Sequence, residues 1–170
     1  MICPQPVEPV ASADCFGCVG STIRLNSGRY LDLLDPQPEA FSFLDIAAGL
    51  SKICRFGGQI DRFYSVAEHS FHAYGLAELD RLSKATQWDC LMHDAAEAFI
   101  GDMVKPLKRI LREYQIIESR LERVIADKYQ VYFQNPVIKE IDHRLLIAEK
   151  KRLFAAIDHQ VWPGEETITP

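Results

Sequence analysis

Ionisable side chains gather in one otherwise apolar segment of the sequence, from Leu91 to Lys108. This segment contains the adjacent pair His93 and Asp94, with Glu97 three residues later. A helix turns by about 100° per residue, so these three side chains would project from the same side. Charged groups in apolar surroundings are costly unless they are paired, protonated or bound to metal. Because an imidazole nitrogen and a carboxylate oxygen can hold one divalent cation together, the segment predicts part of a metal site.

Two residues on other predicted helices could complete the shell of such a site. His69 falls in the first turn of a helix that begins near Ser65, and Asp142 lies between Ile138 and Leu145 on the inner side of the last helix. Each has a structural alternative, since a single helical histidine is more often part of a core and an inward carboxylate can pair with arginine. Their combination with the His-Asp pair favours the metal site. No place in the shell is assigned to the other histidines: His72, His143 and His159.

Capping signals and apolar periodicity predict the helices that carry these residues. Ser65 and Glu68 have the spacing of a capping box, and Asn135 followed by Pro136 is typical of a helix start. Five helices are predicted: Phe43–Cys54, Ser65–Leu79, Lys84–Ile100, Leu107–Lys128 and Asn135–Ile157. The inner stripe of the last helix is predicted to consist of Ile138, Ile141, Leu145 and Ala148.

Outside these helices the sequence predicts little regular structure. Two strand-like runs, Thr22–Leu25 and Tyr30–Leu33, flank a turn at Asn26-Ser27-Gly28. The predicted fold is therefore all-α, a compact bundle of five to six helices with a small peripheral β-hairpin. We expect a single domain over residues 21–160, an irregular, proline-rich segment over residues 1–20, and a flexible tail over residues 161–170.

Composition excludes several classes of function. The chain has 170 residues, 48% of them apolar and 25% charged, which is typical of a globular domain. It contains no apolar run near the roughly 20 residues of a membrane span, and its start lacks the features of a signal peptide, so we expect no membrane partner and a cytoplasmic location. The net charge of −5 argues against binding of a nucleic-acid polymer but permits a small anionic substrate. Cys15 and Cys18 have the spacing of a metal-binding or redox pair. Alternatively, they are part of an irregular segment and have no such role.

The order His69, His93-Asp94 and Asp142 on separate helices resembles the HD-domain metal-dependent phosphohydrolases, an all-α superfamily. More narrowly, three segments look like those of small bacterial and phage members: VAEHS (66–70), HDAAEAFIGD (93–102) and KPLK (105–108). This subgroup includes 5′-deoxynucleotidases and phage deoxyadenosine triphosphate triphosphohydrolases. The resemblance extends over about residues 24–154.

The resemblance implies a role for each matching residue. His69, His93, Asp94 and Asp142 would hold one divalent ion (Mn, Co, Zn, Fe or Mg). A second divalent ion could bind together with the substrate. Metal-bound water would attack phosphorus. The implied catalytic carboxylates are Glu97 and Asp102, and the substrate-binding residues are Arg55, Phe56, Lys105 and Lys108, with Arg62 a weaker alternative to Arg55. Of the two lysines, Lys108 is preferred because it begins the long helix. Asp102 could instead be a cap or loop carboxylate, and the lysines could be solvated. Phe56 stands where relatives often have tryptophan and could stack on a base or pack against deoxyribose.

The function implied by the resemblance is a metal-dependent phosphohydrolase of deoxynucleotides, acting on monophosphates or triphosphates. The alternative is a catalytically degenerate domain that binds a nucleotide or a protein partner. Guanosine tetraphosphate hydrolases typically have aspartate where this chain has Ala98, and the GYP motif of cyclic dinucleotide phosphodiesterases is absent from the sequence. Members of the subgroup commonly form homo-oligomers, so an assembly of this kind is also implied.

Overall fold

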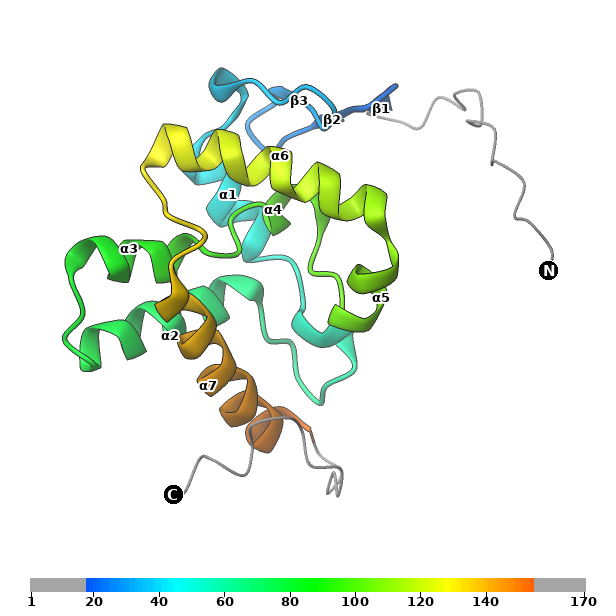
Figure 1. The fold of residues 1–170 in the computed structure, drawn as a ribbon. Helices are drawn as coiled ribbons and strands as arrows, with labels where there is room; N and C mark the ends of the chain where they lie inside the picture. Colours follow the sequence, from blue (N-terminus) through cyan, green and yellow to red (C-terminus); the bar gives the residue numbers. More distant parts are fainter. Residues whose placement is uncertain (1–17, 155–170) are drawn as a thin grey trace, which may run out of the picture.

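The computed structural model describes residues 18–154, which form the predicted all-α domain with a small antiparallel sheet (Figure 1). The helices are α1 (Phe43–Leu50), α2 (Val66–Leu79), α3 (Lys84–Met92), α4 (Glu97–Ile100), α5 (Lys105–Ile110), α6 (Arg112–Tyr129) and α7 (Pro136–Leu153), with two short 3₁₀ turns, η1 (Pro38–Ala40) and η2 (Arg55–Gly58). Two of the five predicted helices are each divided in two, which accounts for the seven observed in these residues. Helices α2, α3 and α7 pack together, while α1 contacts α4.

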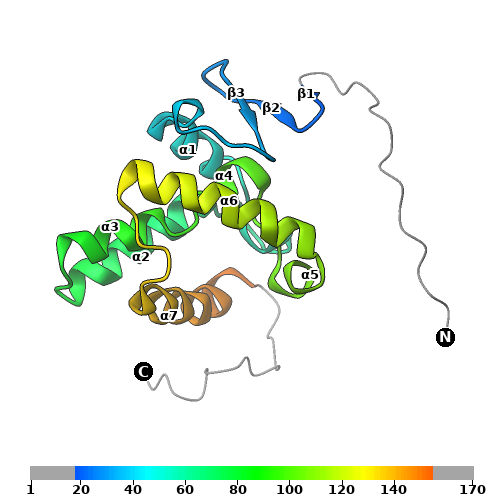
Figure 2. The same cartoon turned by 45° about the horizontal axis from the view of Figure 1, so that its top comes forward.

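The predicted hairpin is present and gains a third strand. Strand β2 (Thr22–Arg24) pairs antiparallel with both β1 (Cys18–Val19) and β3 (Tyr30–Asp32). β1 thus begins inside the segment that was predicted to be irregular, while residues 1–17, with Cys15, lie outside the described part. The sheet lies at one end of the molecule, beyond α1 and α6 (Figure 2). Its turn is joined to α1 by a hydrogen bond of 2.7 Å from the Ser27 amide to Asp45 Oδ1.

Local capping confirms three of the predicted helix starts. The Ser42 side chain caps α1, Ser65 and Glu68 form the predicted capping box of α2, and Asn135 caps α7 with proline in the first turn. An antiparallel bridge joins Cys54, just before η2, to Ser65, the residue that caps α2. This bridge places η2 beside the helix that carries His69.

The predicted helix over Lys84–Ile100 is interrupted at the His-Asp pair, because α3 ends at Met92 and α4 begins at Glu97. Tight turns join the two, with the Ala95 amide bonded to Met92 O and the Glu97 amide to Asp94 O. His93 Nδ1 donates to Cys90 O at 2.8 Å. This carbonyl is the one that a continuous α-helix would offer to the Asp94 amide, so the side chain competes with the helix.

Other helix boundaries also differ from the predictions. The first helix, α1, ends at Leu50 rather than at Cys54. The long helix over Leu107–Lys128 is divided at Leu111, whose backbone has a non-helical ψ of 88°. The last helix ends at Leu153, because Phe154 is extended with ψ 122°, and the predicted continuation to residue 157 leaves the described range. Within that helix Ile138, Ile141 and Leu145 are buried as predicted, but Ala148 is exposed and Glu149 is buried in its place.

The core consists of two apolar clusters that meet near His69. The first joins the sheet, α1 and α6 through residues such as Leu31, Ile46 and Leu121, and it includes Val66 of α2. The second joins α2, α3 and α7 and includes Ala73. Val66, His69 and Ala73 follow one another at helical spacing on the same side of α2. His69 therefore lies, fully buried, between two apolar regions.

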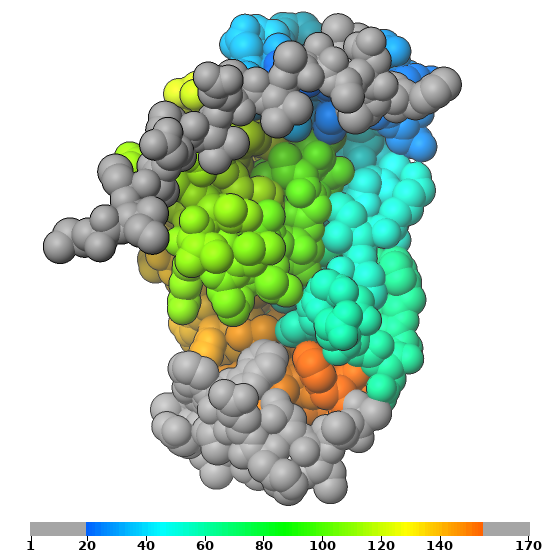
Figure 3. All heavy atoms as spheres, turned by 90° about the vertical axis from the view of Figure 1, so that its right-hand side faces the viewer, coloured from blue at the N-terminus to red at the C-terminus, as the bar shows by residue number. Residues whose placement is uncertain are grey.

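Viewed from the side, the surface of α5 lies next to the segment after α1, with the end of α7 below (Figure 3). A Cβ added to Gly57 would lie 3.8 Å from a methyl group of Val104, which confirms that η2 and the start of α5 are neighbours. None of the helices within residues 18–154 has both the length and the hydropathy needed to cross a membrane.

Candidate metal centre

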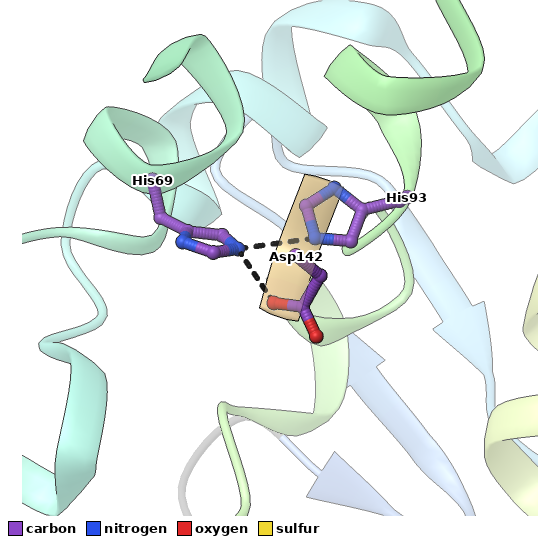
Figure 4. Close-up of side chains that lie close together, drawn as sticks. All are labelled: His69, His93 and Asp142. Carbon is purple, nitrogen blue, oxygen red and sulfur yellow. Dashed lines mark hydrogen bonds and ion pairs between the residues drawn. The ribbon is translucent and has the colours of Figure 1, made fainter. Parts of the chain in front are cut away.

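Three residues from separate parts of the chain converge on one point (Figure 4). His69 comes from α2, His93 from the turn after α3, and Asp142 from α7, and each offers one ligand atom within 4.8 Å of the others. His69 Nε2 lies 3.1 Å from His93 Nε2 and 3.3 Å from Asp142 Oδ1. Donors bound to one ion at about 2.0–2.1 Å stand roughly 3.0–3.4 Å apart. These two separations fit this range, and all three ligand atoms lie within 4.8 Å of one another, so the three residues could hold a metal ion.

The outer nitrogen of each imidazole is already bonded to an acceptor. His93 Nδ1 lies 2.8 Å from Cys90 O, and His69 Nδ1 lies 2.6 Å from Glu149 Oε1. A carbonyl and a carboxylate can only accept, so both Nδ1 atoms carry protons and both Nε2 atoms present lone pairs to the centre when the rings are neutral. Two lone pairs 3.1 Å apart require a cation or a proton between them. This donor arrangement is the one that metal-bound histidines have in proteins.

Asp94 lies against the same point. Its Oδ2 is 3.2 Å from His93 Nε2 and 3.6 Å from His69 Nε2, and its side chain is 16% exposed. Burial by itself would raise the pKa of Asp94, but nearby positive charge, chiefly that of His93, holds this pKa well below its usual range. Asp142 is likewise an ionised carboxylate, because His69 and Lys105 lower its pKa against the effect of burial. All four predicted metal-ligating residues thus lie together.

Arg55, the predicted phosphate-binding residue, lies beside these carboxylates. Its guanidinium is 3.5 Å from Asp94 Oδ2 and 4.0 Å from Asp142 Oδ1, although the side chain is only 10% exposed. Its Nε makes no hydrogen bond to any residue in the described range. The alternative residue, Arg62, is exposed on the surface.

Glu149 is a further residue of the centre that the sequence interpretation missed. Besides contacting His69, it accepts a hydrogen bond of 2.9 Å from the Tyr64 hydroxyl and lies 3.4 Å from Arg55. A signal was present in the sequence, because Glu149 follows Leu145 by four residues and Asp142 by seven on one side of α7. A stripe of this kind admits either residue 148 or residue 149, and its apolar character favours alanine over glutamate.

The two predicted catalytic carboxylates lie close enough to Asp94 for its charge to act on both. Glu97 is 8% exposed, and its Oε2 makes no hydrogen bond within the described residues. Burial and the negative charges of Asp94 and Asp102 raise the pKa of Glu97 far above its usual range. The pKa of Asp102 is also raised, mainly by burial. Glu97 therefore favours its protonated form at neutral pH in the absence of added cations.

The two predicted phosphate-binding lysines have different surroundings. Lys105 is exposed, and its Nζ lies 3.2 Å from Asp142 Oδ2. Lys108 Nζ instead lies 2.6 Å from Oε1 of Glu118, whose side chain is 9% exposed. Both lysines line a groove of about 450 Å³, whose walls are formed by Lys105, Lys108, Arg109, Gln115, Glu118 and Ser119.

Phe56 adopts an unusual backbone conformation next to Arg55. Its φ of 57° and ψ of 28° are left-handed, a region that residues with a side chain seldom occupy. Its ring makes an edge contact with Phe154 at 5.3 Å between centroids and lies under the Arg55 guanidinium at 5.4 Å. The other histidines are not within the group of candidate ligands: His72 is exposed and bonded to Tyr64, His143 is half-buried on α7, and His159 lies outside the described residues.

Comparison with known proteins places the chain in a family. No known protein-family profile matches it. The uncharacterised protein YfdR of Escherichia coli K12 is 37% identical over 150 residues, which are 87% of this chain and 80% of YfdR. The chain belongs to the YfdR family. An uncharacterised protein of Rhodobacter capsulatus is 39% identical over 107 residues, which are 60% of this chain and 55% of that protein. Neither relative's description assigns an activity, so membership of the YfdR family leaves function to be inferred from the candidate metal centre.

Proposed function

We propose that this protein is a divalent-metal-dependent phosphohydrolase that acts on deoxynucleotides. The observation that carries the proposal is the convergence of His69 Nε2, His93 Nε2 and an Asp142 oxygen, with both outer nitrogens bonded to acceptors. Two imidazoles and two carboxylates suit several first-row ions, including Mn, Co, Zn and Fe. The resemblance of the ligand order and of the HDAAEAFIGD segment to HD-domain phosphohydrolases supplies the reaction class.

Such a cation, when bound, supplies Lewis acidity that activates water and neutralises phosphate oxygens. The protein's own residues then have distinct tasks. Arg55, held beside Asp94 and Asp142, would bind a phosphate oxygen with a fixed guanidinium. Glu97, buried and with a raised pKa, would hold a proton for the leaving oxygen. Lys105, on the exposed side of Asp142, would draw the anionic substrate toward the centre.

A substrate panel tests this proposal directly. Protein purified without chelator is incubated with deoxynucleoside mono- and triphosphates and Mn²⁺, Co²⁺, Zn²⁺ or Mg²⁺. We expect hydrolysis that depends on metal and falls at least about 100-fold in Asp94→Ala, as for removal of a group that orients the reacting atoms. Asp127→Ala is the matched control, because Asp127 is exposed on α6. Release of orthophosphate identifies a nucleotidase, and release of triphosphate identifies a triphosphohydrolase.

The outcome against the proposal is absence of metal-dependent turnover on every member of the panel. Nucleotide affinity that is equal with and without metal would then favour a domain that binds without catalysis. The proposal also includes a cytoplasmic location, where deoxynucleotides are found, and a homo-oligomer by analogy with the resembling subgroup. Light scattering of the purified protein tests the assembly.

A further inference from the structure

Glu149 is the buried carboxylate at the base of the candidate metal centre. It lies seven residues after Asp142 on α7, so both side chains project from the same side of the helix. Its exposure is only 5%, and its Oε1 lies 2.6 Å from His69 Nδ1. A carboxylate in such a place is costly to bury unless other groups compensate its charge.

Two other groups supply that compensation. The Tyr64 hydroxyl donates to Glu149 Oε1 at 2.9 Å, and the Arg55 guanidinium lies 3.4 Å from Oε2. Oε2 makes no hydrogen bond to any residue between 18 and 154, so its contact with Arg55 is an ion pair. A single carboxylate thus contacts one candidate metal ligand through one oxygen and the candidate phosphate-binding residue through the other.

We propose that Glu149 is a positioning residue that fixes His69 for metal binding and Arg55 for substrate binding. The hydrogen bond to Nδ1 selects the tautomer whose free Nε2 faces His93 and Asp142, and the carboxylate makes the imidazole a stronger ligand. The second oxygen balances the charge of Arg55, which would otherwise be drawn further toward Asp94 and Asp142. This inference rests on the proposed function only in taking the centre to hold a metal ion.

Two substitutions separate the contributions of Glu149. Glu149→Gln keeps an oxygen that can accept from His69 but loses the charge that faces Arg55. Glu149→Leu has a similar size and loses both. Glu140→Gln and Glu140→Leu are the matched controls, since Glu140 is an exposed glutamate of the same helix. Circular dichroism establishes that each variant is folded.

Two readouts that do not involve turnover then test the positioning role. Titration with Co²⁺ gives the affinity and the visible spectrum of the bound ion. Long-range ¹H–¹⁵N spectra of metal-free ¹⁵N-histidine protein at pH 10, where the ring is neutral because its pKa is about 9, identify the His69 tautomer. We expect Glu149→Leu to weaken Co²⁺ binding by about 10- to 100-fold, the range found for such supporting carboxylates. Glu149→Gln should fall between Glu149→Leu and the wild type and keep the Nδ1–H proton.

The possible outcomes are distinct. Unchanged Co²⁺ affinity, spectrum and His69 signals in folded Glu149→Leu would refute the positioning role and leave the hydrolase proposal standing. Wild-type protein that binds Co²⁺, with the expected loss in the variants but no turnover on any nucleotide, would refute the hydrolase proposal and support the role of Glu149. A wild-type protein that binds no divalent metal would overturn both. If Glu149→Leu does not fold, Glu149→Gln decides by the same two readouts.

Discussion

The Nε2 atoms of His69 and His93 lie 3.1 Å apart, while each ring donates through Nδ1 to another acceptor. Without a cation, a proton must occupy the space between them. Burial opposes a charge on His69, but its hydrogen bonds with Asp142 and Glu149 raise its pKa to about 9. Metal and proton therefore compete for the same nitrogen.

Metal affinity should accordingly depend on pH. The proton on His69 is present below about pH 9 and must leave before the nitrogen can bind an ion. The apparent affinity for Mn²⁺ should therefore increase by about tenfold per pH unit as pH rises from 6 toward 9, and level off above that value. Calorimetric titration at several pH values measures it. Affinity that is constant between pH 6 and 8.5 would show that no such proton is displaced.

The contact between α1 and α4 should make Gly49 sensitive to substitution. A Cβ at this position would lie 2.6 Å from Ala98 O and 2.9 Å from the Ala98 Cβ. Gly49→Ala should lower the free energy of unfolding by about 1–3 kcal/mol, because α4 must move to relieve the overlap. Since α4 carries Glu97, the proposed activity should fall as well.

Gly75 provides the control for that substitution. It is also a helical glycine, in α2, but a Cβ there would meet no atom within 4 Å. Gly75→Ala should raise the free energy of unfolding by about 0.5–1 kcal/mol through helix propensity alone. Urea denaturation of both variants gives the comparison. Equal effects of the two substitutions would contradict the close contact at Gly49.

Substitution of the two lysines near the centre should affect two different properties, stability for Lys108 and substrate binding for Lys105. Lys108→Met would leave the nearly buried Glu118 carboxylate without its partner, and we expect a loss of about 1–2 kcal/mol in the free energy of unfolding. Lys105 is 63% exposed, so Lys105→Met should change stability by less than about 0.5 kcal/mol. In the proposed reaction Lys105→Met should instead raise KM several-fold. Urea denaturation and steady-state kinetics measure the two effects. If Lys108→Met raised KM and Lys105→Met lowered stability, Lys108 would be the lysine that binds phosphate.

The left-handed backbone at Phe56 can be tested with two small residues. Glycine adopts φ 57° without strain, whereas alanine keeps the steric cost of a Cβ. Both lose the contacts of the ring with Phe154 and Arg55. Phe56→Gly should therefore be more stable than Phe56→Ala by about 1 kcal/mol in urea denaturation. Equal stability of the two variants would indicate that η2 changes its backbone once the ring is removed.

Some features of the fold are determined by residues that are close to one another in the sequence. Helix starts at Ser42, Ser65 and Asn135 could be predicted, since capping depends on a few neighbouring residues. The break after Met92 could not, because it involves a side-chain bond from His93 to a helix carbonyl. The candidate ligands were found because their types and order form a pattern.

Glu149 was missed for a different physical reason. Its importance comes from the packing of α7 against α2, and helical spacing alone does not distinguish position 148 from position 149. Glu118 is a similar case, because its burial next to Lys108 depends on how α5 folds against α6. Partners that come from distant segments require the fold before they can be identified.

His69 and Glu149 are separated by 80 residues in the chain, and this separation has a consequence for biosynthesis. A nascent polypeptide that has emerged only as far as α6 contains the buried imidazole but not the carboxylate that orients it. Because burial of a polar group without a partner costs about 1–3 kcal/mol, we expect the α2 region to remain incompletely stabilised until α7 docks. Emergence and docking of α7 closes the second apolar cluster and adds Asp142 and Glu149 in the same event. A product that terminates before α7 would thus lack part of its core together with Asp142 and Glu149.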